Sequence, residues 1–291
     1  MDYEPLWSPR VLSLLCYPPH KCPLGVASSR AARLESLGVA GLCDIGSTEI
    51  YVGGGTARVI GKGHSSVVLA VAARWSPQPL ALKVRRYDSK RPSLRDEGRA
   101  LQRASRAGAA PQAYYYDDDL ILMDYLGPVT LEAVLSAGTA DAAADALQEA
   151  LKASRALDCA HVVHQELHRP YRNFVYPYWP LRATALVVDL ESASEGCGNV
   201  NKLVGFIYSN VLGAELPREL QELLRAYKRS GCPRDLYDAI ESEVASRLET
   251  LRSSGPGAVN RAASRRSPGP GRRLWSGALP RPQWQASWAA R

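Results

Sequence analysis

The sequence contains no apolar run of about 18 residues, the length that a membrane-spanning helix requires. Its first residues also lack the basic, apolar and small-residue order of a secretory signal. We therefore expect a soluble, cytoplasmic protein. Of the 291 residues, 46% are hydrophobic, which is enough to bury the core of one large domain or two smaller ones.

Zinc-binding patterns are absent as well. The sequence has no Cys-x-x-Cys pair and no histidine at a zinc-ligand spacing beside a cysteine. We expect most of the cysteines to be buried thiols. A disulfide is the alternative if the source is a hyperthermophile, because intracellular proteins of such organisms do carry disulfides. The six cysteines are Cys16, Cys22, Cys43, Cys159, Cys197 and Cys232.

Acidic residues and lysine are missing from residues 253–291, which contain seven arginines. These seven charges account for the whole net charge of +7, so the basic balance is no sign of a nucleic-acid-binding face on the fold. We expect a disordered tail rich in Arg, Pro, Gly and Trp. Its Trp275, Trp284 and Trp288 suit weak contact with RNA or an acidic partner. The alternative is that the tail has no function and that its composition reflects a reading frame extended through GC-rich DNA.

Apolar and β-branched residues dominate the stretch 56–87, where a glycine turn separates two strand patterns. This pattern predicts a sheet built on hairpins. After it, Ser93 and Asp96 have the spacing of a helix capping box, and Gly108 marks the helix end. Two further strands are expected within 113–126.

Helical periodicity dominates the second half of the chain. The longest pattern covers 139–161 and places Ala143, Leu147, Leu151 and Leu157 on one apolar face. Strands first and helices after predict an α+β fold. The remaining expected elements are a strand pair at 173–176 and 185–192, and helices at 29–38, 200–212, 216–229 and 235–251.

Lys83 lies inside an apolar strand pattern (LALKVRR, residues 80–86), where an unpaired ammonium is costly to desolvate. In the next helix, Glu97 shares a face with Leu94 and Leu101, so its carboxylate is directed inward. A buried carboxylate needs a cation, and we expect an ion pair between Glu97 and Lys83. The alternatives are a solvated edge-strand lysine and a carboxylate at the edge of the helix face.

Asp189 ends the apolar strand pattern ALVVD, and Glu191 follows it closely. A carboxylate at a strand end suits a hard cation such as Mg²⁺, which prefers oxygen ligands and bridges phosphate oxygens. Glu191 is a candidate second ligand. The alternative is an aspartate that only caps the next turn.

The segment GKGHSSVV, residues 61–68, lies between two predicted strands, which argues against a P-loop and against a dinucleotide-binding fold. It resembles the glycine-rich flap of protein kinases, in which Gly61 and Gly63 would approach the phosphates and Val68 would press on the base. Ser66 replaces the third glycine. The alternative is an ordinary glycine turn in a hairpin.

The segment LILMDYL, residues 120–126, resembles the linker between the two lobes of a kinase. In LILMDYL, Met123 matches the gatekeeper, and the backbone of Asp124 and Leu126 is placed to bond adenine. A buried strand that ends in aspartate is the alternative for this segment.

The loop HQELHRPYRN, residues 164–173, resembles a kinase catalytic loop. Glu166 takes the place of its aspartate, His168 the place of its phosphate-contacting lysine, and Asn173 comes two positions later than its metal-binding asparagine. Glutamate moves the carboxylate outward by about one bond, ~1.5 Å. A misplacement of ~1 Å can cost on the order of a hundredfold in rate. Our hypothesis is that the two extra residues, with Pro170 restricting the turn, set the backbone back and compensate.

As a set, these motifs are similar to those of archaeal predicted serine/threonine protein kinases, which are small, atypical kinases related to the RIO and KEOPS-complex kinases. The resemblance covers about residues 56–212 and depends on the order and spacing of the motifs. It implies a bilobal kinase-like fold that binds ATP with Mg²⁺ or Mn²⁺. The implied activity is transfer of the γ-phosphate to a protein serine or threonine hydroxyl, with autophosphorylation or ATP hydrolysis as variants.

The resemblance also implies how the chain is divided. Residues 1–50 become an N-terminal extension with a short helix, 51–126 a β-rich N-lobe and 127–252 a reduced, mainly helical C-lobe, before the tail. The chain has no Ala-Pro-Glu motif, and too few residues follow Asp189 for a conventional activation segment. Regulation by activation-loop phosphorylation is therefore not expected.

The same resemblance gives the residues their roles. Lys83 and Glu97 position the phosphates, and Glu166 orients the acceptor hydroxyl. The implied metal ligands are Asp189, Asn173 and Glu191. Two alternatives remain open, namely a kinase-like module that binds ATP without transferring phosphate, and a small-molecule kinase.

Overall fold

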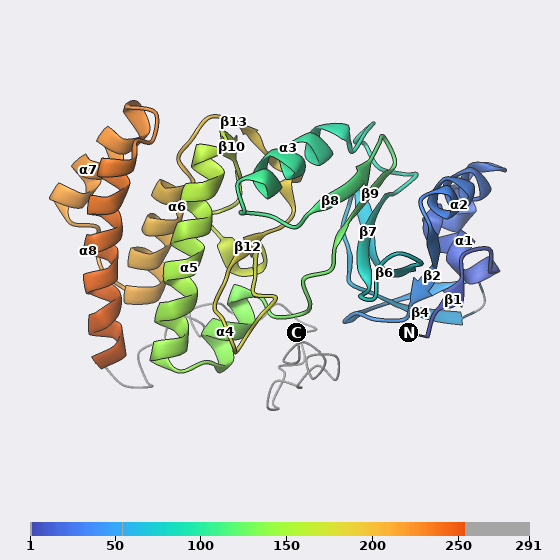
Figure 1. The fold of residues 1–291 in the computed structure, drawn as a ribbon, viewed down its shortest axis with the longest axis horizontal. Coiled ribbons are helices and arrows are strands. Elements are labelled where there is room, and N and C mark those ends of the chain that lie inside the picture. The colour runs from blue at the N-terminus through green and yellow to red at the C-terminus, as the bar shows by residue number, and fades with distance from the viewer. Residues whose placement is uncertain (1, 54, 254–291) are drawn as a thin grey trace.

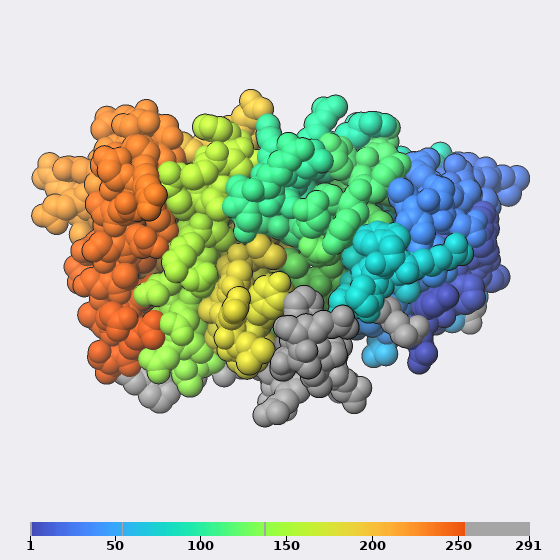
Figure 2. All heavy atoms as spheres, in the orientation of Figure 1, coloured from blue at the N-terminus to red at the C-terminus, as the bar shows by residue number. Residues whose placement is uncertain are grey.

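The computed structural model describes residues 2–53 and 55–253 (Figure 1). The part of the chain up to about residue 126 is built mainly on strands, and the part after it mainly on helices. The α+β class is therefore as predicted. In Figure 2, the atoms of α3 (Arg95–Arg106) lie between the C-terminal helices and the segments of the sheet. The predicted tail, 253–291, lies outside the described residues from position 254 onward.

The main sheet is antiparallel and has the strand order β1-β2-β6-β7-β9-β8, with β5 paired to β6. Its two central strands, β6 and β7, are buried along nearly their whole length, which explains their continuous apolar sequence. The strands predicted within 56–87 and 113–126 are confirmed. The bounds are β1 (Glu4–Pro5), β2 (Val39–Cys43), β5 (Gly61–Lys62), β6 (Ser66–Ala73), β7 (Leu80–Arg85), β8 (Ala113–Tyr116) and β9 (Leu120–Asp124).

The N-terminal segment adds helices and strands to one side of this sheet (Figure 1). The expected helix near 29–38 is confirmed as α2 (Val26–Ser36), which ends just before Gly38 at φ 81°. The sequence pattern does not indicate α1 (Pro9–Leu15), the 3-10 turn at Pro19–Lys21, or the hairpin of β3 (Thr48–Val52) and β4 (Gly55–Val59) that follows β2.

Two disulfides correct the expectation that most cysteines are buried thiols. Cys16 pairs with Cys22 across the turn after α1, and Cys197 pairs with Cys232 at a sequence separation of 35. The thiols of Cys43, which is buried, and of Cys159, which is exposed, remain free. The expectation was wrong because packing of distant loops, rather than local spacing, brings the second pair together.

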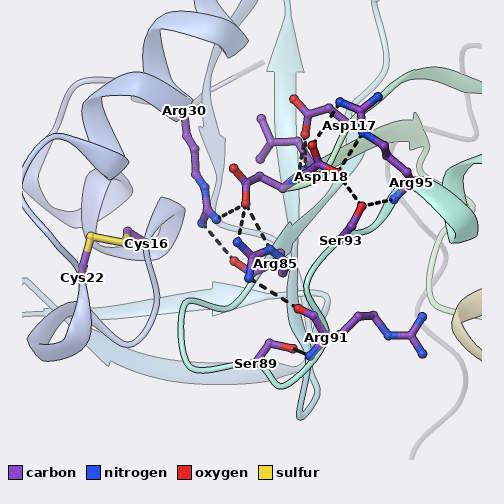
Figure 3. A network of polar contacts seen from close by, with 12 residues as sticks. Cys16, Cys22, Arg30, Arg85, Ser89, Arg91, Ser93, Arg95, Asp117 and Asp118 are labelled. Atoms are coloured by element: carbon purple, nitrogen blue, oxygen red, sulfur yellow. Dashed lines mark hydrogen bonds and ion pairs between the residues drawn. A yellow bond between two sulfur atoms is a disulfide. The ribbon is translucent and has the colours of Figure 1, made fainter.

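A buried arginine fastens the N-terminal helices to the sheet (Figure 3). The guanidinium of Arg30, on α2, donates to the carbonyls of Leu15 and Arg85 at 2.7 and 3.0 Å, and to the Asp119 carboxylate at 2.6 Å. Arg85 donates to the same carboxylate at 2.8 Å. One carboxylate in the β8–β9 turn therefore serves two guanidiniums, which is why burial of Arg30 is tolerated.

Asp117, in the same turn, accepts hydrogen bonds from the backbone of Asp119 and Leu120 at 2.7 and 2.8 Å, from the Tyr115 hydroxyl, and from Arg33. Burial alone raises the pKa of Asp117, but these donors outweigh it and hold the pKa below its ordinary value. Because the unfolded chain then binds the proton more readily, Asp117 stabilises the fold above its unfolded pKa, and this contribution is lost as the pH falls below about 4.

We expect Asp117→Asn to lower the free energy of unfolding at pH 7 and to flatten its decline between about pH 4 and pH 2. Urea unfolding of wild type and variant across this range measures both effects. If the free energy of unfolding declined with pH equally steeply in the two proteins, another carboxylate would control the loss of stability at low pH.

The helical part is built around α5, whose predicted apolar face is buried at Ala143, Leu147, Leu151 and Leu157. Helices α6 and α8 pack on α5 (Figure 1). The predicted helices at 139–161, 200–212, 216–229 and 235–251 are confirmed, the second of them continuing as a π-helix over Ile207–Leu212. The bounds are α3 (Arg95–Arg106), α4 (Leu131–Ala137), α5 (Ala140–Cys159), α6 (Asn199–Phe206), α7 (Arg218–Arg229) and α8 (Arg234–Ser253).

Short strand pairs connect these helices. The predicted pair is confirmed as β11 (Phe174–Val175) with β12 (Leu186–Val187), and β10 (Val162–Val163) pairs with β13 (Ser194–Glu195). Each pair is antiparallel and only two residues long. None of the helices in the described ranges is both long and apolar enough to cross a membrane.

The start of α3 differs from the predicted capping box. Leu94 occupies the N-cap position, and the Ser93 hydroxyl accepts from the Arg95 N–H at 3.0 Å while donating to Asp118. Asp96 pairs with Arg99 on the exposed side. The predicted capping box between Ser93 and Asp96 is therefore wrong, because Asp118 of the β8–β9 turn accepts from the Ser93 hydroxyl instead.

Candidate functional site

Lys83 is the centre of a charged cluster between the sheet and the helical part. It lies on β7 opposite Val68 of β6, and only 4% of it is exposed. Its ammonium donates to Glu97 at 2.6 Å and to Asp189 at 3.0 Å. Burial alone lowers the pKa of Lys83, but the two carboxylates outweigh it and raise the pKa above its ordinary value. The predicted ion pair with Glu97 is confirmed, and Lys83 is a cation at neutral pH.

Glu97, on the first turn of α3, is 5% exposed. Its Oε1 accepts from Lys83, whereas its Oε2 is buried without a hydrogen-bond partner among the described residues. Burial raises the pKa of Glu97, and Lys83 offsets only part of this rise. An unsatisfied carboxylate oxygen is costly, so the pair is not optimised for stability.

Gly98 determines how closely α3 approaches the sheet. A Cβ atom at this position would lie 2.3 Å from the ring of Tyr116, on β8, which is closer than real Cβ contacts allow. Glycine therefore permits the approach that brings the neighbouring Glu97 to Lys83.

Asp189 follows β12 in a left-handed backbone conformation, with φ 63° and ψ 58°. Aspartate is one of the few non-glycine residues that adopt this conformation readily. Its side chain is 55% exposed, so one face of the carboxylate reaches solvent. Partial desolvation raises the pKa of Asp189, but the Lys83 ammonium outweighs it, so the pKa lies below its ordinary value.

Glu191, the other predicted carboxylate of this segment, contacts protein donors. It accepts from the Ser65 hydroxyl, pairs with Arg91 at 3.1 Å and lies 3.7 Å from Lys83. Ser65 belongs to the hairpin of β5 and β6, so Glu191 fastens this hairpin to the segment after β12. The structure therefore leaves Asp189, rather than Glu191, as the carboxylate open to a cation.

The loop 164–173 is organised by His164, which is fully buried. Its Nδ1 accepts from the Glu166 N–H at 3.1 Å, so its Nε2 carries the proton and donates to the Val188 carbonyl at 3.2 Å. Burial lowers the pKa of His164, which favours this neutral form. One imidazole ring therefore joins the Glu166 backbone to the residue before Asp189.

The side chain of Glu166 is exposed and makes no hydrogen bond or ion pair to the described part of the chain. The structure brings the Glu166 backbone to the site but does not place its carboxylate against Lys83 or Asp189. His168 is also exposed, and its Nδ1 lies 3.2 Å from the Gln165 carbonyl within the same loop. Both side chains are therefore open to solvent.

Asn173 is buried, and its side-chain nitrogen Nδ2 lies 3.2 Å from His164 Nε2. The backbone carbonyl of Asn173 accepts from the Val188 N–H at 2.9 Å, which places Asn173 beside the residue preceding Asp189. No group of three or more His, Cys, Asp or Glu side chains able to hold a metal occurs in 2–53 or 55–253. Mg²⁺ commonly takes only one or two protein ligands together with phosphates and waters, so the half-exposed Asp189 carboxylate suits such an ion, whereas the Asn173 side chain is buried against His164.

Two polar residues that sequence reasoning missed hold this loop in place. Asn199, at the start of α6, accepts from the His164 N–H at 2.9 Å and donates to the Val162 carbonyl at 2.7 Å. Asp158, on α5, accepts from the Asn199 side chain and from the N–H groups that begin α6. The only available signal was a polar residue, Asp158, beside the apolar face of α5.

The predicted flap is a hairpin, as expected. Gly61 pairs with Val68, and the Gly63 N–H donates to the Ser66 carbonyl at 2.8 Å. A Cβ atom would have room at Gly61, so this glycine is not required by packing. Val68 and Lys83 are directly opposite in the ladder, so their side chains lie on the same face of the sheet.

The predicted linker continues from β9 into an irregular segment after Asp124. The Asp124 N–H already donates to the Gln112 carbonyl at 3.1 Å, so it is not free for a ligand. The N–H of Leu126, in contrast, has no acceptor within the described ranges. Of the two residues predicted to contact adenine, only Leu126 therefore has a backbone N–H available to donate to it.

No family model matches this chain, and no curated protein matches it significantly. Any function must therefore be argued from the geometry of the site.

Proposed function

We propose that this chain is an ATP-dependent phosphotransferase with a bilobal, protein kinase-like fold that acts on a serine or threonine hydroxyl. The observation that carries the proposal is the contact of Lys83 with Glu97 on one side and Asp189 on the other. A buried lysine held by a helix glutamate beside a strand-end aspartate is the arrangement that protein kinases use for the phosphates and the metal.

The chain's own residues support a division of roles. Lys83, a cation at neutral pH, binds phosphate oxygens, and Glu97 fixes its position. Asp189 and Asn173 hold Mg²⁺ or Mn²⁺, which when bound neutralises phosphate charge. The hairpin of Gly61 to Val68 covers the phosphates.

The linker and the loop 164–173 complete the assignment. The N–H of Leu126 bonds adenine. Glu166 orients the acceptor hydroxyl, and its position depends on His164, which holds the Glu166 backbone.

The first test is nucleotide binding and phosphate transfer with γ-labelled ATP and Mg²⁺. We expect ATP to stabilise wild type against heat and label to appear on protein. Asp189→Asn, which keeps the left-handed backbone, should lose label by at least about 100-fold. Asp96→Asn, an exposed carboxylate on α3, is the matched control. If ATP does not stabilise wild type, the proposal fails.

A second variant separates transfer from binding. We expect Glu166→Gln to reduce labelling by about 100-fold or more, while thermal stabilisation by ATP is unchanged, because the exposed carboxylate acts only on the acceptor. Glu219→Gln, an exposed carboxylate on α7, serves as control. Undiminished labelling in Glu166→Gln would remove this residue from the mechanism.

A second candidate function is ATP binding without transfer. It is favoured by the Glu166 carboxylate, which contacts nothing described, and by the Asn173 amide, which lies against His164. Thermal stabilisation by ATP with neither label nor released phosphate supports this candidate. Label that appears only on an added metabolite supports a small-molecule kinase instead.

A further inference from the structure

A cavity of about 510 Å³ is lined in part by Gln165, which belongs to the loop 164–173. Its walls come from that loop, from the segment before α6, from α6 and from the end of α7. Lys202 and Lys228 supply two ammonium groups to it. The other lining residues that matter here are His161, Gln165, Gly196 and Gly198.

Neither lysine of this cavity is ion-paired with a carboxylate of residues 2–53 or 55–253. Lys202 is half-buried and donates to the His164 carbonyl at 2.9 Å and to the Gln165 amide oxygen at 3.2 Å, neither of which is an anion. Within the described residues, neither lysine has a carboxylate oxygen within 4.0 Å. Burial and the nearby Lys228 lower the pKa of Lys202, and the Asp158 carboxylate offsets only part of this lowering.

The carboxylates near the cavity are occupied elsewhere. Glu195 lines the wall, but it pairs with Arg103 at 3.0 Å. Asp158 is buried and accepts from the N–H groups of Gly198 and Asn199 at 2.7 and 2.9 Å. Two ammonium groups without an ion-paired carboxylate among the described residues favour a ligand of two negative charges.

The cavity is held in shape by covalent and steric contacts. The disulfide between Cys197 and Cys232 ties the segment before α6 to the loop after α7. The stem of Lys228 lies over Gly198, where a Cβ atom would be 3.4 Å from the lysine Cε. The two lysines are therefore presented from segments whose separation is fixed before a ligand arrives.

We infer that this cavity binds a phosphate monoester carried by the acceptor substrate. A phosphate monoester is close to a dianion at neutral pH and offers three acceptor oxygens, which matches two ammonium groups better than one carboxylate does. The acceptor assignment rests on the proposed function, because Gln165 lines the cavity and is adjacent to Glu166. An acceptor bound here presents a neighbouring hydroxyl to Glu166.

Binding of the anion is tested without nucleotide. Calorimetric titration of the full chain with O-phosphoserine, at constant ionic strength adjusted with chloride, should give saturable binding to wild type. Lys228→Gln and Lys202→Gln should each weaken O-phosphoserine binding by about 10-fold. The control is Lys152→Gln, which changes an exposed lysine of α5 and should leave the binding unchanged. Equal affinity in all four proteins would overturn the site.

A pair of peptides tests the ligand class. We expect a peptide with phosphoserine beside a serine to bind about 10-fold more tightly than the same peptide with aspartate. Equal binding of the two peptides would overturn the assignment to phosphate.

Labelling of the phosphopeptide with γ-labelled ATP tests the acceptor role. Lys228→Gln should raise KM for the phosphopeptide by about 10-fold with kcat unchanged, which is the sign of lost ground-state binding. An unchanged KM would reject the acceptor role. Phosphoserine binding that depends on Lys228 in a chain that ATP does not stabilise would keep the cavity as a site and refute the proposed function alone.

Discussion

Replacing Asp158 by alanine is expected to lower the free energy of unfolding by about 4 kcal/mol. The Asp158 carboxylate is 1% exposed and accepts from the Gly198, Asn199 and Val200 N–H groups, from the Asn199 side chain and from the Tyr227 hydroxyl. Alanine leaves these donors buried without an acceptor. The cost is therefore that of several unsatisfied groups rather than of one lost hydrogen bond.

The same substitution should loosen the loop 164–173, because Asn199 is held by Asp158 and in turn holds the His164 N–H. Urea unfolding measures the stability change, and hydrogen exchange of the His164 and Glu166 amides measures the loosening. Asp145→Ala, an exposed aspartate of α5 that pairs with Arg252, should cost no more than about 1 kcal/mol. A loss below that size in Asp158→Ala would show that water replaces the carboxylate.

Replacing Lys83 by methionine is expected to lower the free energy of unfolding by about 3–5 kcal/mol. It leaves Glu97 buried with no cation while its backbone position is unchanged. The double variant Lys83→Met/Glu97→Leu should recover most of this loss, because two apolar groups of similar size replace a buried pair that already contains one unsatisfied oxygen. Such a recovery would show that the ion pair is not needed for stability, as the proposed phosphate-binding role of Lys83 requires.

The single variant has a pH signature as well. Without Lys83, the pKa of Glu97 rises further above its unfolded value, since burial is then unopposed by a cation. The folded state then binds more protons than the unfolded state, so stability should fall as the pH rises from about 4 upward through the raised pKa. Denaturant unfolding of wild type, Lys83→Met, Glu97→Leu and the double variant at pH 5 and pH 8 measures the effect. A double variant less stable than Lys83→Met would contradict the account.

The pairing of Lys83 with Glu97 is predictable from sequence because it depends on local rules. A lysine in an apolar strand and a glutamate on the leucine face of the next helix both carry a desolvation cost that pairing relieves. The buried face of α5 follows from helical periodicity in the same way. These features need no knowledge of which segments meet at long range.

The remaining parts of the site depend on long-range packing. Asn199 meets Asp158 at a separation of 41 residues, and no spacing rule connects them. Glu191 looks like a metal ligand from its position after a strand, yet Ser65 and Arg91, about 100 or more residues earlier, occupy it. Local sequence identifies a carboxylate but not the donors that compete for it.

The close contact at Gly98 gives α3 a mechanical limit. The Tyr116 ring limits how far α3 can move toward β8. A displacement of α3 away from the sheet separates Glu97 from Lys83, whose 2.6 Å contact is made at that limit. The position of α3 on the sheet therefore controls whether the lysine is paired.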